Sequence, residues 1–130
     1  MNSKLSKLND TIAAVATAQG RAGMSVVRVS GPQTKQIAKK ILGYEPKHMT
    51  AKYSSFKTPE GEVVDFGVAL FFGSPRSYTG EDVLELTCHG GQAIVDHLLD
   101  VLFQCGARIA ERGEFTKLSL IHISEPTRPE

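Results

Sequence analysis

The sequence lacks the features that mark several classes of protein. Its 130 residues contain no tryptophan and only two cysteines, Cys88 and Cys105, which form no CxxC pair. Neither a disulfide framework nor a metal signature is therefore indicated. No apolar run approaches the ~18 residues of a membrane span, and none follows the N-terminal lysines as it would in a signal peptide. We expect a cytoplasmic protein with no membrane partner and no bound metal.

A charge excess of one sign is also missing. Fifteen lysine and arginine residues stand against fourteen acidic residues, which leaves a net charge of +1. Bulk charge therefore points to neither nucleic acid nor a membrane surface, although it leaves a local basic patch open. The composition is that of an ordinary globular protein, and the length fits one domain with a single core.

The hydrophobic patterns that are present predict an α+β fold. Val-rich or alternating runs predict strands at 11–16, 24–30, 53–57, 63–72, 82–88 and 107–110, with Gly61 in a hairpin turn. Apolar residues at helical spacing predict two helices, one with Pro32 in its first turn and ending at Gly43, the other spanning 92–104. Elements in this order favour a mixed β-sheet with about two helices on one face.

Two opposite charges lie inside apolar strands. Arg28 interrupts MSVVRVS, and Glu85 interrupts DVLELTC, where alternation places it on one face with Val83 and Thr87. Isolated charges are rarely left unpaired at such positions, so the simple explanation is an exposed sheet face or a mutual ion pair. The alternative is a ligand site, in which Glu85 accepts two N–H donors of a flat heterocycle and Arg28 holds an acidic group.

Two glycine-containing segments are candidates for anion binding. Gly20–Gly23 places Arg21 between glycines, and His89-Gly90-Gly91 precedes a helix whose first N–H groups favour negative charge. The first segment is neither a P-loop nor a dinucleotide fingerprint, and a plain strand connector explains it equally well. A lone histidine at a helix start is more often a cap or turn residue than a catalyst, so no catalytic residue is predicted.

Together these motifs resemble a known family. TIAAVATAQGRAGMSVVRVSGP, SYTGEDVLEL, HGG and RGEFT occur in order from about Asn9 to Thr116. They are similar to the N-terminal domain of the bacterial tRNA uridine-modification GTPases, the MnmE/TrmE family. The resemblance implies a fold like the folate-binding domains of one-carbon enzymes. Arg28 and Glu85 match the family's contacts to 5-formyltetrahydrofolate or a related reduced folate, and the further candidates for ligand or interface contacts are Arg21, His89, Gly90 and Gly91.

The resemblance also implies partners and a wider reaction. It implies a homodimer, a flavin-dependent partner protein of the MnmG/GidA type, and tRNA bound through the full complex and modified at carbon 5 of its wobble uridine. The folate supplies the one-carbon unit. GTP hydrolysis, with magnesium and potassium, belongs to a separate GTPase domain. No Gly-Lys-Ser/Thr phosphate loop occurs in these 130 residues, so we expect no GTPase activity from this chain alone.

Two alternatives stay open: a dimerisation scaffold that binds no folate by itself, and a generic anion- or nucleotide-binding module. We expect a polar leader at 1–8, the folate-binding and dimerisation domain at 9–117, and a non-native tail at 118–130, with the family's GTPase and helical domains absent. After GEFT the chain departs from the family, and LSLIHISEPTRP resembles the translated read-through of a cloning adapter. The family's folate-contacting lysine therefore has no counterpart here.

Overall fold

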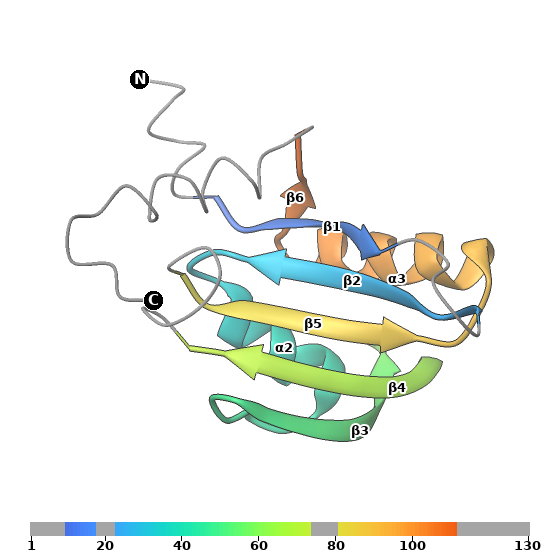
Figure 1. The fold of residues 1–130 in the computed structure, drawn as a ribbon. Helices are drawn as coiled ribbons and strands as arrows, with labels where there is room; N and C mark the ends of the chain where they lie inside the picture. Colours follow the sequence, from blue (N-terminus) through green and yellow to red (C-terminus); the bar gives the residue numbers. More distant parts are fainter. Residues whose placement is uncertain (1–9, 18–22, 74–80, 112–130) are drawn as a thin grey trace.

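The computed structural model describes residues 10–17, 23–73 and 81–111. Within them it forms six strands and two helices (Figure 1). In chain order these are β1 (Ile12–Thr17), β2 (Ser25–Ser30), α2 (Thr34–Leu42), β3 (Thr50–Lys57), β4 (Val63–Phe72), β5 (Val83–Cys88), α3 (Gln92–Gln104) and β6 (Arg108–Ile109). The predicted α+β class is confirmed.

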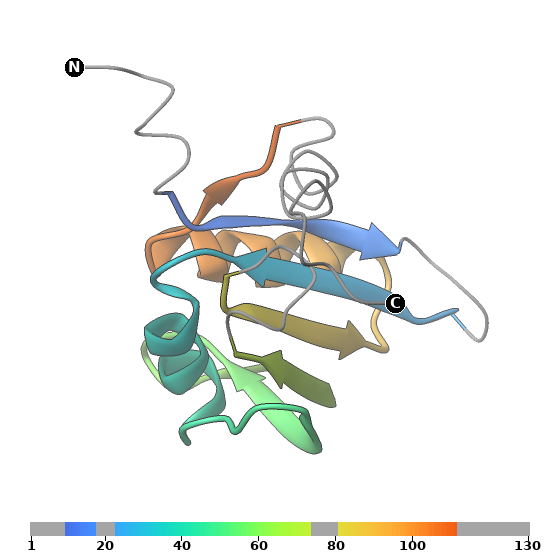
Figure 2. The ribbon, with the colours of Figure 1, turned by 60° about the vertical axis from the view of Figure 1, so that its left-hand side comes forward.

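The strands form one sheet in the order β3-β4-β5-β2-β1-β6. All neighbours run antiparallel except β1 and β6, which are parallel, so the sheet is mixed as predicted. Figures 1 and 2 show both helices against the same face, with α2 beside β3 and α3 beside β1. The opposite face, which we call the open face, carries no helix from the described residues.

The hydrophobic core lies between the sheet and the two helices. In β5, Leu84, Leu86 and Cys88 are fully buried there, whereas Glu85 and Thr87 are only half-buried on the open face. This confirms the predicted alternation, except that Val83 is also fully buried. The buried helix residues are Ile37, Ala38, Ile41 and Leu42 from α2, and Val95, Leu98, Val101 and Leu102 from α3. Each large apolar side chain buried here contributes about 1.5–3 kcal/mol.

The element boundaries follow hydrogen bonds that the sequence pattern does not display. Helix α2 begins at Thr34, after Pro32, and the backbone N–H of its N-cap residue Gln33 donates to the Thr11 hydroxyl at 2.8 Å. The predicted turn at Gly61 is confirmed by its φ of 96°, a left-handed value that favours glycine. Neither helix is long and apolar enough to cross a membrane.

Candidate functional site

Arg28 and Glu85 form an ion pair in the middle of the open face. They are register partners on the neighbouring strands β2 and β5. Nε of Arg28 donates to Oε2 of Glu85 at 2.9 Å, and Nη2 lies 2.7 Å from the same oxygen. Each side chain is 24% exposed. Both contacts fall on Oε2, and no described residue contacts Oε1, so this oxygen can accept a hydrogen bond from a ligand.

Small and apolar side chains surround the pair. Its own cross-strand row continues to Leu70 of β4 on one side and Ala14 of β1 on the other. The next row of the open face holds Val68, Thr87 and Val26. All five are half-buried. The pair therefore lies in a mostly apolar setting, where a flat ring could stack beside a carboxylate and a guanidinium.

The His89-Gly90-Gly91 turn is held by a residue that the sequence analysis missed. Asp65 of β4 accepts hydrogen bonds at Oδ2 from the backbone N–H groups of His89, at 2.9 Å, and Gly90, at 3.2 Å. Nδ1 of His89 lies 2.9 Å from the carbonyl oxygen of Phe66. A carboxylate of the chain itself thus binds two N–H groups of the turn, both of which precede the N-cap of α3. The only sequence signal was one acidic residue in the apolar run VVDFGVALFF.

Gly90 and Gly91 have different roles in this turn. A Cβ added to Gly90 would lie 2.3 Å from Cγ1 of Ile94, so glycine is required for the close approach of α3. Gly91 is the N-cap of α3, and its carbonyl accepts the N–H groups of Ile94 and Val95. From Glu85 to His89 the chain advances about 13 Å at the usual strand rise. The turn therefore lies apart from the ion pair.

Cys88 is structural rather than reactive. Its side chain is fully buried, and its Sγ donates weakly to the carbonyl of Leu86 at 3.7 Å. Burial, and to a lesser degree the negative charge of Asp65, raises the pKa of this thiol to about 12. Because the thiolate is the nucleophilic form, burial keeps Cys88 in its less reactive, protonated form near neutral pH. The described residues contain no group of His, Cys, Asp and Glu side chains suited to a metal ion.

Other predictions fall outside the described residues. Arg21 and most of its glycine segment belong to the gap at 18–22, and the tail expected at 118–130 follows the last described residue. Gly23 is described, and Ser25 just beyond it pairs with Cys88. The start of β2 and the His89 turn therefore lie at the same end of the sheet.

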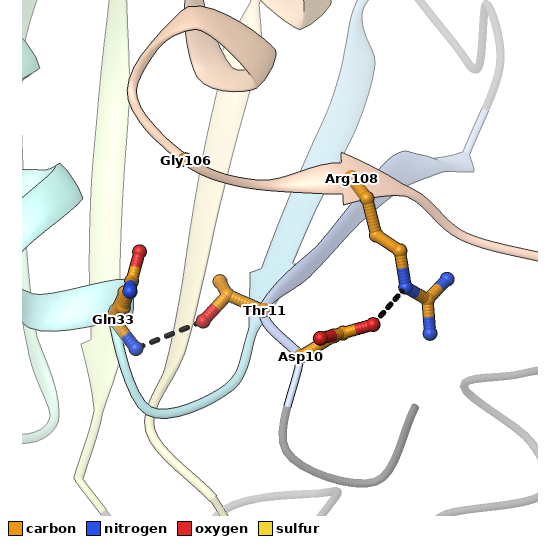
Figure 3. A pocket seen from close by; sticks show the side chains of 5 residues that line it. All are labelled: Asp10, Thr11, Gln33, Gly106 and Arg108. Atoms are coloured by element: carbon orange, nitrogen blue, oxygen red, sulfur yellow. Dashed lines mark hydrogen bonds and ion pairs between the residues drawn. The ribbon is translucent and has the colours of Figure 1, made fainter. Parts of the chain in front are cut away.

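A small cavity of about 160 Å³ lies where β1, α2 and β6 begin (Figure 3). Its lining is Asp10, Thr11, Gln33, Gly106 and Arg108. Nε of Arg108 lies 2.7 Å from Oδ2 of Asp10, so the two charges offset each other. The Thr11 hydroxyl already accepts the N–H of Gln33. Asp10, Arg108 and the Thr11 hydroxyl are thus engaged within the cavity lining itself.

The fold and the ion pair define a class of protein: an α+β domain whose sheet is covered by helices on one face and offers a charged pair in an apolar setting on the other. The family described as GTP-binding protein TrmE N-terminus matches residues 11–122. This chain belongs to that family.

Individual relatives agree with the family match. Over 114 residues, 88% of this chain, it is 51% identical to the tRNA modification GTPase MnmE of Saccharophagus degradans and 53% identical to that of Hydrogenovibrio crunogenus. Over 112 residues, which are 86% of this chain, it is 48% identical to the protein of the same name from Neisseria meningitidis serogroup B. The chain spans about a quarter of the length of each of these relatives.

Proposed function

We propose that this chain is the reduced-folate-binding module of a tRNA-modification GTPase, with 5-formyltetrahydrofolate or a close relative bound on the open face. The observation that supports the proposal is the half-buried Arg28–Glu85 pair. The resemblance described above implies that these two residues contact the folate. The family membership and the names of the relatives support the wider context of tRNA modification.

The chemistry of the pair suits a pterin ring. The ring carries adjacent N–H donors on one edge, and a carboxylate can accept both. Oε1 of Glu85 takes no contact from the described residues, while Oε2 already accepts two donors from Arg28. A ligand that uses both oxygens must therefore displace one Arg28 contact. The freed guanidinium N–H can then meet an oxygen acceptor of the ligand. The bound folate supplies the one-carbon unit.

The direct test is calorimetric titration of the chain and its variants with 5-formyltetrahydrofolate. Glu85→Gln and Arg28→Ala should each lower the affinity about thirtyfold or more, because each removes one of the two charged groups that we propose contact the ligand. Glu62→Gln is the matched control, because it removes a glutamate charge at an exposed position. Circular dichroism reports whether each variant is folded.

The outcomes separate folate binding from the alternative explanations of the site. If folded Glu85→Gln and Arg28→Ala bind as tightly as the unchanged chain, the pair is only an ion pair and the folate assignment fails. If the unchanged chain binds no folate, the dimerisation scaffold is the better description. Competition by GTP or pyrophosphate at the same site would instead favour a generic anion-binding module.

The proposal includes homodimerisation. Tyr53 and Phe66 are 66% and 48% exposed, on strands β3 and β4. Large exposed apolar side chains on one sheet are typical of a surface that a partner covers. Sedimentation equilibrium should show a mass that rises with concentration, and Phe66→Ser should weaken the association. A strictly monomeric chain at high micromolar concentration would contradict this part of the proposal.

The remaining parts of the proposal concern the longer protein. We expect this module to work in the cytoplasm with a flavin-dependent partner of the MnmG/GidA type, on the wobble uridine of tRNA. The two free cysteines of the described residues fit a reducing compartment. GTP hydrolysis, with its magnesium and potassium, requires a phosphate loop that these 130 residues do not contain.

A further inference from the structure

Positive charge is concentrated in one part of a nearly neutral chain. Residues 33–58, which comprise the N-cap and body of α2, the following connection and β3, contain six lysines and a single acidic residue. Their net charge is +5, and the other residues together carry −4. The lysines are Lys35, Lys39, Lys40, Lys47, Lys52 and Lys57. We call these six side chains the lysine surface.

The structure brings four of these lysines to the connection between α2 and β3. Lys35 and Lys39 reach Glu45 at 3.1 and 3.9 Å. Nζ of Lys52 lies 4.3 Å from the ring centre of Tyr44. Nζ of Lys57 donates to the carbonyl of Leu42 at 3.4 Å. Side chains from the helix and from the sheet edge thus converge on residues 42–45.

The single acid within the lysine surface does not cancel its charge. A hydrogen bond from Lys35, then the charges of Lys35 and Lys39, lower the pKa of Glu45, so this carboxylate stays ionised and offsets one lysine only. All six lysines except the half-buried Lys57 are exposed. Helix α3 shows the contrast, because it carries Asp96 and Asp100 and no lysine or arginine.

We propose that the lysine surface binds the phosphate backbone of RNA. The proposal deepens the proposed function, on which it rests for the choice of RNA. Exposed lysines bind phosphates as point charges, and they are depleted in protein–protein interfaces, which argues against an acidic protein as the partner. The ammonium groups of Lys52 and Lys57 both lie against residues 42–45, so they offer neighbouring positive charges to the phosphates of one backbone segment.

A simpler role for the strand lysines is to protect the sheet edge. Strand β3 is the last in the sheet order, and edge lysines prevent strands of other molecules from pairing there. That role accounts for Lys52 and Lys57. It does not account for Lys35, Lys39 and Lys40 on α2, which lie on a helix and protect no edge.

The test is the salt dependence of binding between the 130-residue chain and an unmodified, fluorescently labelled tRNA transcript, followed by anisotropy. Lys40→Gln, Lys47→Gln and Lys52→Gln are combined, because these three residues form no ion pair among the described contacts. We expect affinity at about 50 mM KCl to fall tenfold or more, and the slope of log K against log salt to decrease by about two. The control is Asp96→Asn with Asp100→Asn, which changes charge on α3 and should leave the slope unchanged.

Three results would overturn the proposal. The first is a folded triple variant with unchanged affinity and slope, which leaves only edge protection. The second is no binding of tRNA to the unchanged chain at about 50 mM KCl. The third is lysine-dependent binding of poly-glutamate without binding of tRNA, which would identify an acidic protein partner. Folate titration of the triple variant distinguishes this proposal from the previous one, because Arg28 and Glu85 lie on the open face and should bind folate unchanged.

Discussion

The two faces of strands β2 and β5 differ in burial and in charge, although successive residues of the same two strands form both. Toward the helices, Val27, Val29, Leu84 and Leu86 are fully buried. Toward the open face, Arg28 and Glu85 are each 24% exposed and form an ion pair. The helix-covered face stabilises the fold, and the open face carries the charged groups that we propose bind a ligand.

This separation means that stability and binding can be altered independently. An apolar residue on the helix-covered face stabilises the folded state because its side chain is buried, and truncating that side chain leaves a cavity. A charged pair at partial exposure contributes little to stability because solvent screens it. We therefore expect substitutions on neighbouring residues of one strand to affect different measurements.

The largest effect should come from the covered face. Leu86→Ala removes a fully buried side chain and should lower the free energy of unfolding by about 2–5 kcal/mol. Its neighbour Thr87, half-buried on the open face, is the matched control. Thr87→Ala should change stability by only about 0.5 kcal/mol. Urea denaturation measures both, and equal losses for the two variants would contradict the comparison.

A smaller effect should follow loss of the turn contact. Asp65→Ala removes the acceptor of the His89 and Gly90 N–H groups and should cost about 1–2 kcal/mol. Asp65→Asn keeps an acceptor oxygen and should cost less. Amide hydrogen exchange provides the specific measurement, because the His89 and Gly90 amides should lose protection in Asp65→Ala. Unchanged exchange at both amides would show that the carboxylate does not hold the turn.

A still smaller effect on stability is expected for the ion pair. The double variant Arg28→Gln with Glu85→Gln removes both charges of a partly exposed pair, so it should change the free energy of unfolding by less than about 1 kcal/mol. The same variant should bind folate at least about thirtyfold more weakly. A double-mutant cycle from thermal melts would give the coupling between the two residues. A coupling energy of several kcal/mol between Arg28 and Glu85 would show that the open face also contributes substantially to stability.

The smallest effect on stability at neutral pH is expected from the thiol of Cys88. Its pKa is raised to about 12, so the folded state favours the thiol, and the resulting stabilisation is complete below the ordinary thiol pKa of 9.0. It is lost as the pH rises from there toward 12. Near neutral pH we expect alkylation of Cys88 to be much slower than in the unfolded chain, as measured by mass spectrometry. Equal rates in the folded and unfolded chain would show that the thiol is accessible.

Local patterns predicted the elements well, because periodicity is a local property. The run from Gln92 to Gln104 has helical spacing, and α3 has those bounds. The alternation in β5 placed Glu85 opposite Leu86. Pro32 was expected in the first turn of α2, whereas the helix begins at Thr34. The Thr11 hydroxyl that binds the N–H of the N-cap residue Gln33 lies 22 residues earlier in the chain.

The candidate site could be predicted only in part, because its contacts join distant segments. Arg28 and Glu85 are 57 residues apart, and only the register of β2 with β5 makes them partners. An ion pair was one of the explanations that the sequence left open. Asp65 was missed because its contact to His89 spans 24 residues, and a single acid in a strand does not indicate which turn it reaches.

The position of β2 between β1 and β5 has a consequence for synthesis on the ribosome. β2 is complete once Ser30 has been added, but its neighbour β5 is complete only at Cys88. The ribosome needs about 3–12 s for the residues between them at the usual 5–20 residues per second. During that time the β1–β2 hairpin has no third strand, and a two-stranded hairpin is marginally stable in water. The nascent chain therefore exposes Val27 and Val29 for seconds, and a chaperone that protects them must act before β5 emerges.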